Sequence, residues 1–332
     1  MLLRISVVLT AICVLSLGCA PQRFIPTTQA GAGRGKIDVI AHRGASAYAP
    51  ENTMAAYQLA MQMGADWIHV NCRLSQDDEV VVIHDDTLDR TTDGSGPVRR
   101  HTVEELKQLD AGSWMDEEFT GEQIPTLAEV LDLARGRRGV ISDTLDITPG
   151  RIGVYIELQP LREDQPVRSH IMGIAAQYRD LLPDHSDRVY DLLEASRSPN
   201  FYLARRTVDL IRQRNMERRV VIQSSSPVII AAVRSIDNHI RTEYVGDVAP
   251  GDPEWGSFVH WVQITNPHGV NLNHERMTPE QLQYFQQTGR LVHAWTVNNR
   301  DAIQEMAEWN VDGLITDYPD VAFEVLREMG KR

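Results

Sequence analysis

Short apolar runs alternate with amphipathic segments along most of the chain. The first run, Ile37 to Ala41, has the length and composition of a buried strand, and Asn52 can cap a helix over Met54 to Met63 that Gly64 ends. The same succession continues to the C-terminus and predicts eight strands, around Val39, Trp67, Val154, Val220, Thr242, Val270, Leu291 and Leu314. Strands that alternate with helices predict a parallel sheet, and eight such units predict a closed TIM (β/α)8 barrel.

One strand pair departs from this alternation. Trp67 to Leu74 and Val80 to Ile83 both have strand patterns, and residues 76–79 form the connection between them. A parallel crossover needs about a dozen residues or more, so this pair must be an antiparallel hairpin, an arm after the second strand. The turn then puts His84 roughly opposite Asn71.

A second irregular region separates the middle strands. The segment from Arg162 to Arg197 is rich in Arg, Asp, His and Pro, with a partly helical middle at Ile171 to Leu182. We interpret it as a long insertion around residues 160–200, and favour a solvated surface over a headgroup-binding lid. Residues 136–153 are polar with few periodic apolar positions, which predicts a loop before the next strand.

The N-terminus has the pattern of a targeting segment. Arg4 precedes an apolar run of 13 residues, Ile5 to Leu17. This run is shorter than the roughly 20 residues that cross a bilayer as a helix, so it predicts a signal peptide over residues 1–18. Gly18 before Cys19 resembles a bacterial lipoprotein cleavage site, and a plain secretory signal with an incidental cysteine is the alternative.

These features predict the domain layout and the compartment. Residues 19–36 are expected to be a flexible tether that starts at a lipidated Cys19, and residues 37–332 are expected to be the barrel domain. We therefore expect a protein on the periplasmic side of the cell envelope, anchored to a membrane by its lipid or otherwise secreted. Cys72 is then the one cysteine of the folded domain, so no internal disulfide is expected, and its strand pattern favours a buried position.

Charge and motifs exclude some classes of function. The 332-residue chain has 33 basic against 46 acidic residues, a net charge of -13, and a binder of nucleic acid needs a basic face. No Gly-rich dinucleotide fingerprint and no phosphate-binding P-loop occur in the sequence, which argues against a nucleotide-binding sheet. The sequence does not define an oligomeric state.

Polar residues gather where the predicted strands end. Reactive residues of a TIM barrel lie at the C-terminal ends of its strands. Arginine can hold a phosphate with two parallel hydrogen bonds, and histidines can exchange protons near neutral pH, so this set suits phosphoryl chemistry. The residues at these ends are His42, Arg43, His69, Asn71, His84, Glu157, Gln159, Gln223, Asn271, Asn273, Trp295 and Asp317.

Several motifs in order give the chain a family resemblance. It resembles the glycerophosphodiester phosphodiesterase family from about Ile37 to the C-terminus, apart from the region 162–197. The motifs are His42-Arg43-Gly44-Ala45-Ser46, Pro50-Glu51-Asn52-Thr53, Gly64-Ala65-Asp66, Val82-Ile83-His84-Asp85, Asp89-Arg90-Thr91-Thr92-Asp93-Gly94, Ile124-Pro125-Thr126-Leu127, Tyr155-Ile156-Glu157, Ala294-Trp295-Thr296-Val297-Asn298 and Ile315-Thr316-Asp317-Tyr318-Pro319.

The resemblance implies an activity and roles for individual residues. It implies a TIM barrel that hydrolyses small glycerophosphodiesters to an alcohol and glycerol 3-phosphate with one divalent cation, Ca²⁺ or Mg²⁺, through a cyclic phosphate. By position, His42 and His84 match the acid/base pair, Arg43 the phosphate-binding arginine and Glu157 a metal ligand. Glu51 matches a glutamate that either contacts the metal or fixes Arg43 through a salt bridge.

The chain departs from the family pattern at the expected metal site. Where the family has a Glu-x-Asp pair of metal ligands, this sequence has His69 and Asn71, and Gln159 stands where a lysine is usual. Hard cations prefer carboxylate and carbonyl oxygens, and imidazole suits softer metals. A site of Glu157, His69 and Asn71 is therefore consistent with a weakened hard-metal enzyme, with an enzyme of a softer metal, or with a barrel that binds without turnover.

These alternatives define the function hypotheses. The leading one is a phosphodiesterase in which Trp295 lines the site as an apolar wall for the glycerol moiety, with Gln159 and Gln223 as further substrate contacts. The second is an inactive barrel that binds phosphodiesters or lipid headgroups. A third is a different phosphodiester or sphingolipid-like substrate, admitted by the insertion. The remaining histidines are expected mostly at the surface or in loops: His101, His170, His185, His239, His260, His268, His274 and His293.

Overall fold

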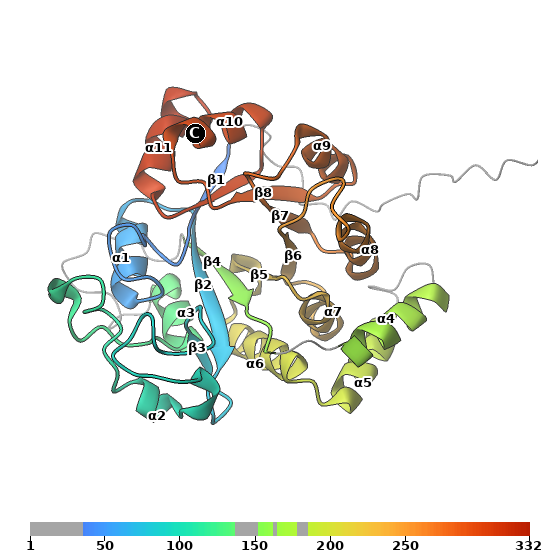
Figure 1. The fold of residues 1–332 in the computed structure, drawn as a ribbon, viewed down its shortest axis with the longest axis horizontal. Helices are drawn as coiled ribbons and strands as arrows, with labels where there is room; N and C mark the ends of the chain where they lie inside the picture. The colour runs from blue at the N-terminus through green and yellow to red at the C-terminus, as the bar shows by residue number, and fades with distance from the viewer. Residues whose placement is uncertain (1–35, 137–151, 162–164, 178–184) are drawn as a thin grey trace, which may run out of the picture.

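Eight parallel strands close into a barrel in the computed structural model, which describes residues 36–136, 152–161, 165–177 and 185–332 (Figure 1). Closure is visible in the pairing, because β1 lies between β9 and β2. The predicted TIM barrel is confirmed. Its strands are β1 (Asp38–Ala41), β2 (Trp67–Leu74), β4 (Gly153–Leu158), β5 (Val220–Ser224), β6 (Arg241–Gly246), β7 (Gly269–Asn273), β8 (Leu291–Trp295) and β9 (Gly313–Thr316).

The predicted hairpin arm is also present. Strand β3 (Val80–Val82) runs antiparallel to β2, with Cys72 opposite Val82. The backbone N–H of Ile83 donates to the carbonyl of Asn71 at 2.9 Å, so His84 lies one residue beyond the position predicted for it. After β3 the chain forms a small separate core that includes Leu88, Val98, Leu106 and Ile124. This core fixes the arm beside β2.

The helices cover the outside of the barrel, and their ends follow local signals. Thr53, rather than the predicted Asn52, caps α1 and accepts from the N–H of Ala56, because Asn52 has a left-handed φ of 60°. Thr126 caps α3 through a reciprocal capping box with Glu129. The helices are α1 (Met54–Gln62), α2 (Val103–Leu106), α3 (Leu127–Arg135), α6 (Pro199–Arg214), α7 (Pro227–Ile236), α8 (Trp255–Thr265), α9 (Pro279–Gln287), α10 (Arg300–Trp309) and α11 (Pro319–Glu328).

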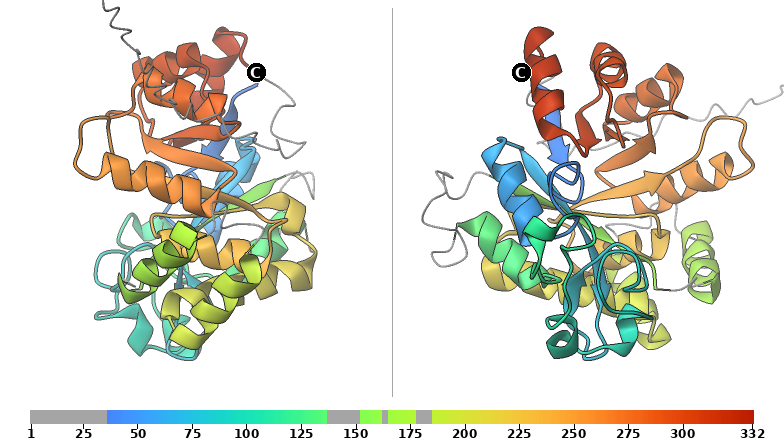
Figure 2. Two further views of the ribbon diagram at one scale, coloured as in Figure 1. Left: turned by 90° about the vertical axis from the view of Figure 1, so that its right-hand side faces the viewer. Right: turned by 60° about the vertical axis from the view of Figure 1, so that its left-hand side comes forward.

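The insertion contributes two helices, α4 (Gln165–Gln177) and α5 (Ser186–Ser196), rather than the one predicted over residues 171–182. They join the outer layer of helices, where α5 packs against α7 and α4 packs against α5 (Figures 1 and 2). The guanidinium of Arg168 lies 5.5 Å from the ring centre of Trp261, which ties α4 to α8. Residues 178–184, and residues 137–151 of the predicted loop, lie outside the described residues.

The barrel interior is filled. Ile40, Tyr155, Val221 and Ile315 form a buried apolar layer inside it, with Trp67 and Trp295 packed against this layer. Cys72 is fully buried, and burial raises the pKa of its thiol, which confirms its structural role. No helix in the described ranges is both long and apolar enough to cross a bilayer. The predicted signal peptide and the tether up to residue 35 lie outside those ranges.

Candidate active site

The first histidine of the site is held by a carboxylate from the last strand. Because β1 and β9 pair with Ala41 opposite Thr316, His42 and Asp317 leave neighbouring strand ends together. His42 Nδ1 donates to Asp317 Oδ1 at 2.7 Å, and Ser46 and Asn298 also donate to this carboxylate, at 2.9 and 2.6 Å.

These contacts set the charge of both groups. Burial works to raise the pKa of Asp317, but the bonds from His42, Asn298 and Ser46 lower it to about 2. Burial lowers the pKa of His42 below its ordinary 6.5, and the hydrogen bond to Asp317 only partly offsets this. The imidazole is therefore neutral near pH 7, oriented by an ionised carboxylate and with Nε2 left for proton transfer.

The second histidine has the same arrangement on the hairpin arm. His84 Nδ1 donates to Asp85 Oδ1 at 2.7 Å. Burial and the nearby charge of Arg43 lower the pKa of His84, with partial opposition from Asp85 and Glu157. The charge of Arg43 also lowers the pKa of His42, so its guanidinium lies close to both imidazoles.

Two arginines share one carboxylate beside these histidines. Arg43 Nη1 donates to Glu51 Oε1 at 2.8 Å, so the salt bridge foreseen for Glu51 is the contact that the structure contains. Arg90 donates to both oxygens of Glu51 and to both oxygens of Asp85, over 2.6–3.0 Å. Arg43 Nε is buried without a partner among the described residues, and it is a donor that a phosphate oxygen would satisfy.

The predicted metal ligands form a network of their own. Register places Asn71 beside Glu157 and Glu157 beside Gln223 on neighbouring strands. His69 Nε2 and Gln223 Nε2 donate to Glu157 Oε2 at 2.9 and 2.7 Å, and Gln159 Nε2 donates to Oε1 at 2.8 Å. Burial works to raise the pKa of Glu157, but the hydrogen bond and charge of His69 and the hydrogen bond from Gln223 lower it to about 2.

Asn71 is held from the opposite side. Its Oδ1 accepts from Asn52 Nδ2 at 3.1 Å, and Asn52 Oδ1 in turn accepts from Tyr57 at 3.0 Å. The rings of His42 and His69 lie 5.1 Å apart between centres, which connects the metal-ligand positions to the first histidine.

Trp295 closes the interior beneath these groups. It is partly buried against the apolar layer that contains Tyr155, and its indole N–H donates to the carbonyl of Asn271 at 3.2 Å. Asn271 Nδ2 also donates to Gln223 Oε1, so the network of Glu157 continues to β7. Trp295 is thus joined to the site through packing and through the backbone of Asn271.

A divalent cation does not fit this donor set as it is arranged. Both oxygens of Glu157, both oxygens of Glu51 and Oδ1 of Asn71 accept hydrogen bonds from protein groups. In the described part of the chain, no three His, Cys, Asp or Glu side chains are grouped closely enough to hold a metal ion. A hard cation takes carboxylate and carbonyl oxygens as its protein ligands, and here each of these oxygens already accepts a bond from a protein donor.

A buried charged cluster around Glu243 lies inside the barrel and was not predicted from the sequence. His293, expected at the surface, is 2% exposed and its Nδ1 lies 2.9 Å from Glu243 Oε2. Tyr155 donates to the same carboxylate, and Arg241 Nε lies 3.5 Å from its other oxygen. Strand alternation could have signalled it, since His293 is two residues before Trp295 on β8 and so shares its inward face.

The positioning residues around the histidines were also missed. Asp85, Arg90 and Asn298 occur in the motifs of the sequence, but no individual role was predicted for them. Arg90 lies 39 residues from Glu51 and Asn298 lies 19 residues from Asp317, and the fold brings each pair together.

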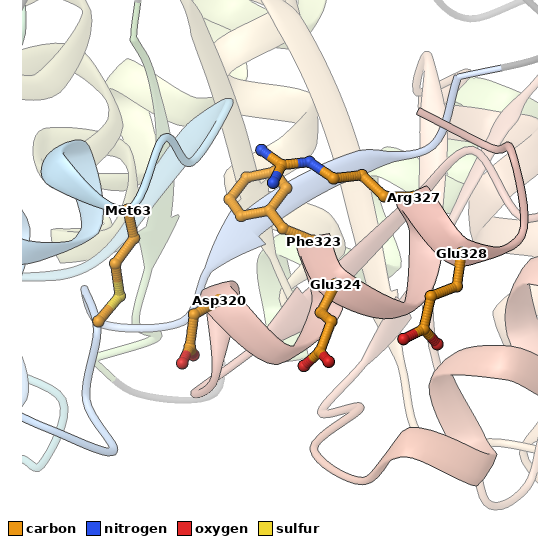
Figure 3. A pocket seen from close by; sticks show the side chains of 6 residues that line it. All are labelled: Met63, Asp320, Phe323, Glu324, Arg327 and Glu328. Carbon is orange, nitrogen blue, oxygen red and sulfur yellow. The ribbon is translucent and has the colours of Figure 1, made fainter.

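A hollow in the described part of the chain lies away from these residues. It measures about 340 Å³ and lies between the end of α1 and one face of α11, with the side chains of both helices around it (Figure 3). Two of its carboxylates, Glu324 and Glu328, pair with Arg300 at 2.9 and 2.7 Å. None of the predicted site residues lines it; the lining residues are Met63, Asp320, Phe323, Glu324, Arg327 and Glu328.

Comparison with known proteins gives one consistent family. The model of the "Glycerophosphoryl diester phosphodiesterase family" matches residues 42–157 and 191–321. A glycerophosphodiester phosphodiesterase of Caldanaerobacter subterraneus is 30% identical over 89% of this chain and 100% of its own length, and one of Bacillus subtilis is 27% identical over 95% and 96%. An Oleispira antarctica phosphodiesterase, solved with sn-glycerol-3-phosphate as product, has a TM-score of 0.67 at 25% identity and covers 87% of this chain and 96% of its own.

Proposed function

The chain belongs to the glycerophosphoryl diester phosphodiesterase family, a family of phosphoric diester hydrolases, and from this membership we propose that it hydrolyses glycerophosphodiesters to an alcohol and glycerol 3-phosphate. One observation carries the proposal at the level of residues. His42 and His84 are each held at Nδ1 by a carboxylate at 2.7 Å, and the charge of Arg43 acts on both imidazoles. Two oriented imidazoles and one cation are what acid/base cleavage of a phosphodiester requires.

The proposed reaction has two balanced steps. In the first, the glycerol hydroxyl next to the phosphate attacks phosphorus, its proton passes to one imidazole, and the other imidazolium protonates the oxygen of the departing alcohol. In the second, water opens the cyclic phosphate, the two histidines exchange roles, and both return to their starting state. Arg43 supplies the charge that holds the phosphate, with its unpartnered Nε available as a donor.

The divalent cation that the family resemblance implies stays a prediction. The oxygens of Glu157, Glu51 and Asn71 are engaged with protein donors, and this arrangement does not fit a hard cation.

A second candidate function follows from the same positions. An inactive barrel that binds phosphodiesters or lipid headgroups is favoured by His69 and Asn71, which replace the expected pair of carboxylates. The two functions differ in turnover but share the recognition of phosphate by Arg43.

Release of glycerol 3-phosphate from glycerophosphocholine by the full chain tests the proposal. We expect turnover that His42→Ala and His84→Ala each lower by about 10²-fold or more, as for a lost acid or base. His170→Ala, an exposed histidine on α4, serves as the control and should leave the rate unchanged. Binding of the substrate by calorimetry without any product would establish the second candidate instead.

The N-terminus carries a separate proposal about location. We propose a signal peptide over residues 1–18, lipid on Cys19, a tether to residue 36 and a barrel domain facing the periplasmic side of the envelope. Cys19→Ser should move the protein from the membrane fraction to the soluble fraction of the expressing cell. Wild-type protein in the soluble fraction would favour the plain secretory alternative, and a variant that stays in the membrane fraction would contradict anchoring through Cys19.

A further inference from the structure

Glu157 is the one carboxylate left among the strand positions where the family has its Glu-x-Asp pair and its following glutamate, and protein donors occupy three of its roughly four acceptor positions. It accepts from His69 and Gln223 on one oxygen and from Gln159 on the other, all within 2.9 Å. The donors come from β2, from β5 and from the residue that directly follows β4, so three parts of the barrel converge on one carboxylate. A cation at Glu157 would compete with these donors, and it could not use both oxygens fully without displacing them.

The other candidate oxygens are engaged as well. Both oxygens of Glu51 pair with Arg43 and Arg90, so a cation there would meet two guanidinium groups. Asn71 offers one amide oxygen, which accepts from Asn52, and Asn71 is 1% exposed. His69 Nδ1 has no partner among the described residues, but one imidazole with one carboxylate falls short of the three or more protein ligands usual for zinc.

Charge balance points the same way. A dication with two carboxylates carries no net charge, so losing all three together leaves the formal charge unchanged, and Gln159 in place of a lysine removes one further positive charge. Two carboxylates without their cation would repel the anionic phosphate, whereas His69 and Asn71 do not. His69 and Asn71, in place of two carboxylates, are therefore consistent with a site that binds the phosphate without a cation.

We propose that the site of this chain takes no divalent cation, and that the network of His69, Gln159 and Gln223 around Glu157 stands in place of the metal ion and its carboxylate ligands. The phosphodiester is then bound by Arg43 and the two histidines alone. The inference rests on the proposed function only for turnover, since the binding of a metal is tested independently of it.

Two measurements on the chelator-treated full chain test the proposal. Calorimetric titration with MgCl₂, CaCl₂, MnCl₂ and ZnCl₂ should show no saturable binding. Turnover of glycerophosphocholine in EDTA should stay within about twofold of turnover with each cation, because no step loses transition-state stabilisation.

A reversed site gives the matched comparison. His69→Glu with Asn71→Asp restores two carboxylates beside Glu157 and should gain saturable Ca²⁺ or Mg²⁺ binding. His170→Glu with Asn310→Asp makes the same change of charge at exposed positions on α4 and after α10, and should gain none. If the reversed site fails to fold, the titrations of the wild-type chain still decide.

The outcomes separate this inference from the proposed function. Saturable binding of any of the four cations by the wild-type chain, or turnover that EDTA abolishes and one cation restores, overturns the inference and leaves the function intact. Absence of turnover with and without every cation overturns the function, and the calorimetry of the wild-type chain then supports the inference if no cation binds and overturns it if one does.

Discussion

Arg90 and Glu51 are joined by two parallel hydrogen bonds, from Nη1 to Oε2 and from Nη2 to Oε1, each 2.8 Å long. The same guanidinium binds Asp85, which holds His84, and Glu51 holds Arg43. Arg90 thus connects Asp85, which holds the proposed acid/base residue His84, with Glu51, which holds the phosphate-binding Arg43. We propose no contact between Arg90 and the substrate.

Removal of Arg90 should lower the rate through position. We expect Arg90→Ala to lower kcat/KM by about 10- to 100-fold, since misplacement by about 1 Å can cost this much. Arg90→Lys should restore little, because an ammonium cannot make paired bonds to two carboxylates. Millimolar methylguanidinium should partly restore the alanine variant, which a loss of folding would not allow.

Arg205 provides the control for Arg90. Its side chain is as exposed, at 45%, and pairs with Glu194 at 3.3 Å away from the site. Arg205→Ala should leave kcat/KM unchanged. An equal loss in both variants, with no rescue of Arg90→Ala, would show that Arg90 acts only on general stability.

The pH dependence follows from the environment of the two histidines. Burial lowers the pKa of both His42 and His84 from 6.5, so the optimum of kcat/KM should lie on the acid side of that value. Asp317→Asn removes the hydrogen bond that raises the pKa of His42. The limb of the profile that reports His42 should then move to lower pH while the maximal rate falls by about 10²-fold. If no limb moves to lower pH, His42 is not a group whose titration controls kcat/KM.

Much of the barrel is predictable because it depends on local patterns. The run Trp67–Leu74 coincides with β2, and the helix predicted over Met54 to Met63 matches α1 to within one residue. Helix α8 (Trp255–Thr265) was missed because it lacks a capping side chain and its apolar residues do not form a narrow stripe. Local patterns therefore predict strands and helices that have clear periodicity and caps. A helix such as α8, which has neither, forms because the surrounding barrel provides its packing.

The candidate site shows the same difference between residues that local patterns identify and contacts that depend on the whole fold. His42, Arg43 and His84 follow strands directly, so strand ends and motifs identify them. The links of Asp317 to His42 and of Arg90 to Glu51 span 275 and 39 residues, and the sequence shows no sign of which polar group will meet which. Glu51 illustrates the difference, because its two predicted roles were equally consistent with the sequence and only its contacts with Arg43 and Arg90 favour one.

The buried pair of Glu243 and His293 should make stability depend on pH. Burial opposes the charged form of each, but their mutual attraction prevails, so the pKa of Glu243 lies below 4.5 and that of His293 above 6.5. The carboxylate contributes above pH 4.5 and loses its contribution as pH falls through its lowered pKa. The imidazole contributes below pH 6.5 and loses its contribution as pH rises through its raised pKa. The pair is therefore worth most between these two values.

Glu243→Gln tests this dependence. At pH 6 we expect it to lower the free energy of unfolding by about 3–5 kcal/mol, as for a broken buried ion pair, and by less at pH 9, where His293 is neutral. Glu194→Gln, which removes a half-exposed partner of Arg205, should cost within about 0.5 kcal/mol. Urea unfolding at the two pH values measures both, and an equal cost of Glu243→Gln at pH 6 and pH 9 would contradict the charged pair.

Gly313 gives His293 the room that it occupies. A Cβ at this position of β9 would lie 2.5 Å from His293 Cδ2 and 3.1 Å from the carbonyl oxygen of Asp38. Gly313→Ala should therefore cost about 1–3 kcal/mol through overpacking. Gly256→Ala, on α8 with no atom within 4 Å of the added Cβ, should be neutral or stabilising by up to about 1 kcal/mol.

The double variant Gly313→Ala with His293→Ala identifies the atom responsible. Removal of the imidazole creates space for the new methyl group, so the two substitutions together should cost less than the sum of their separate costs. Strict additivity in urea unfolding would show instead that the methyl group is opposed by the backbone of Asp38. In that case the small residue at 313 would serve the pairing of β9 with β1 rather than the buried histidine.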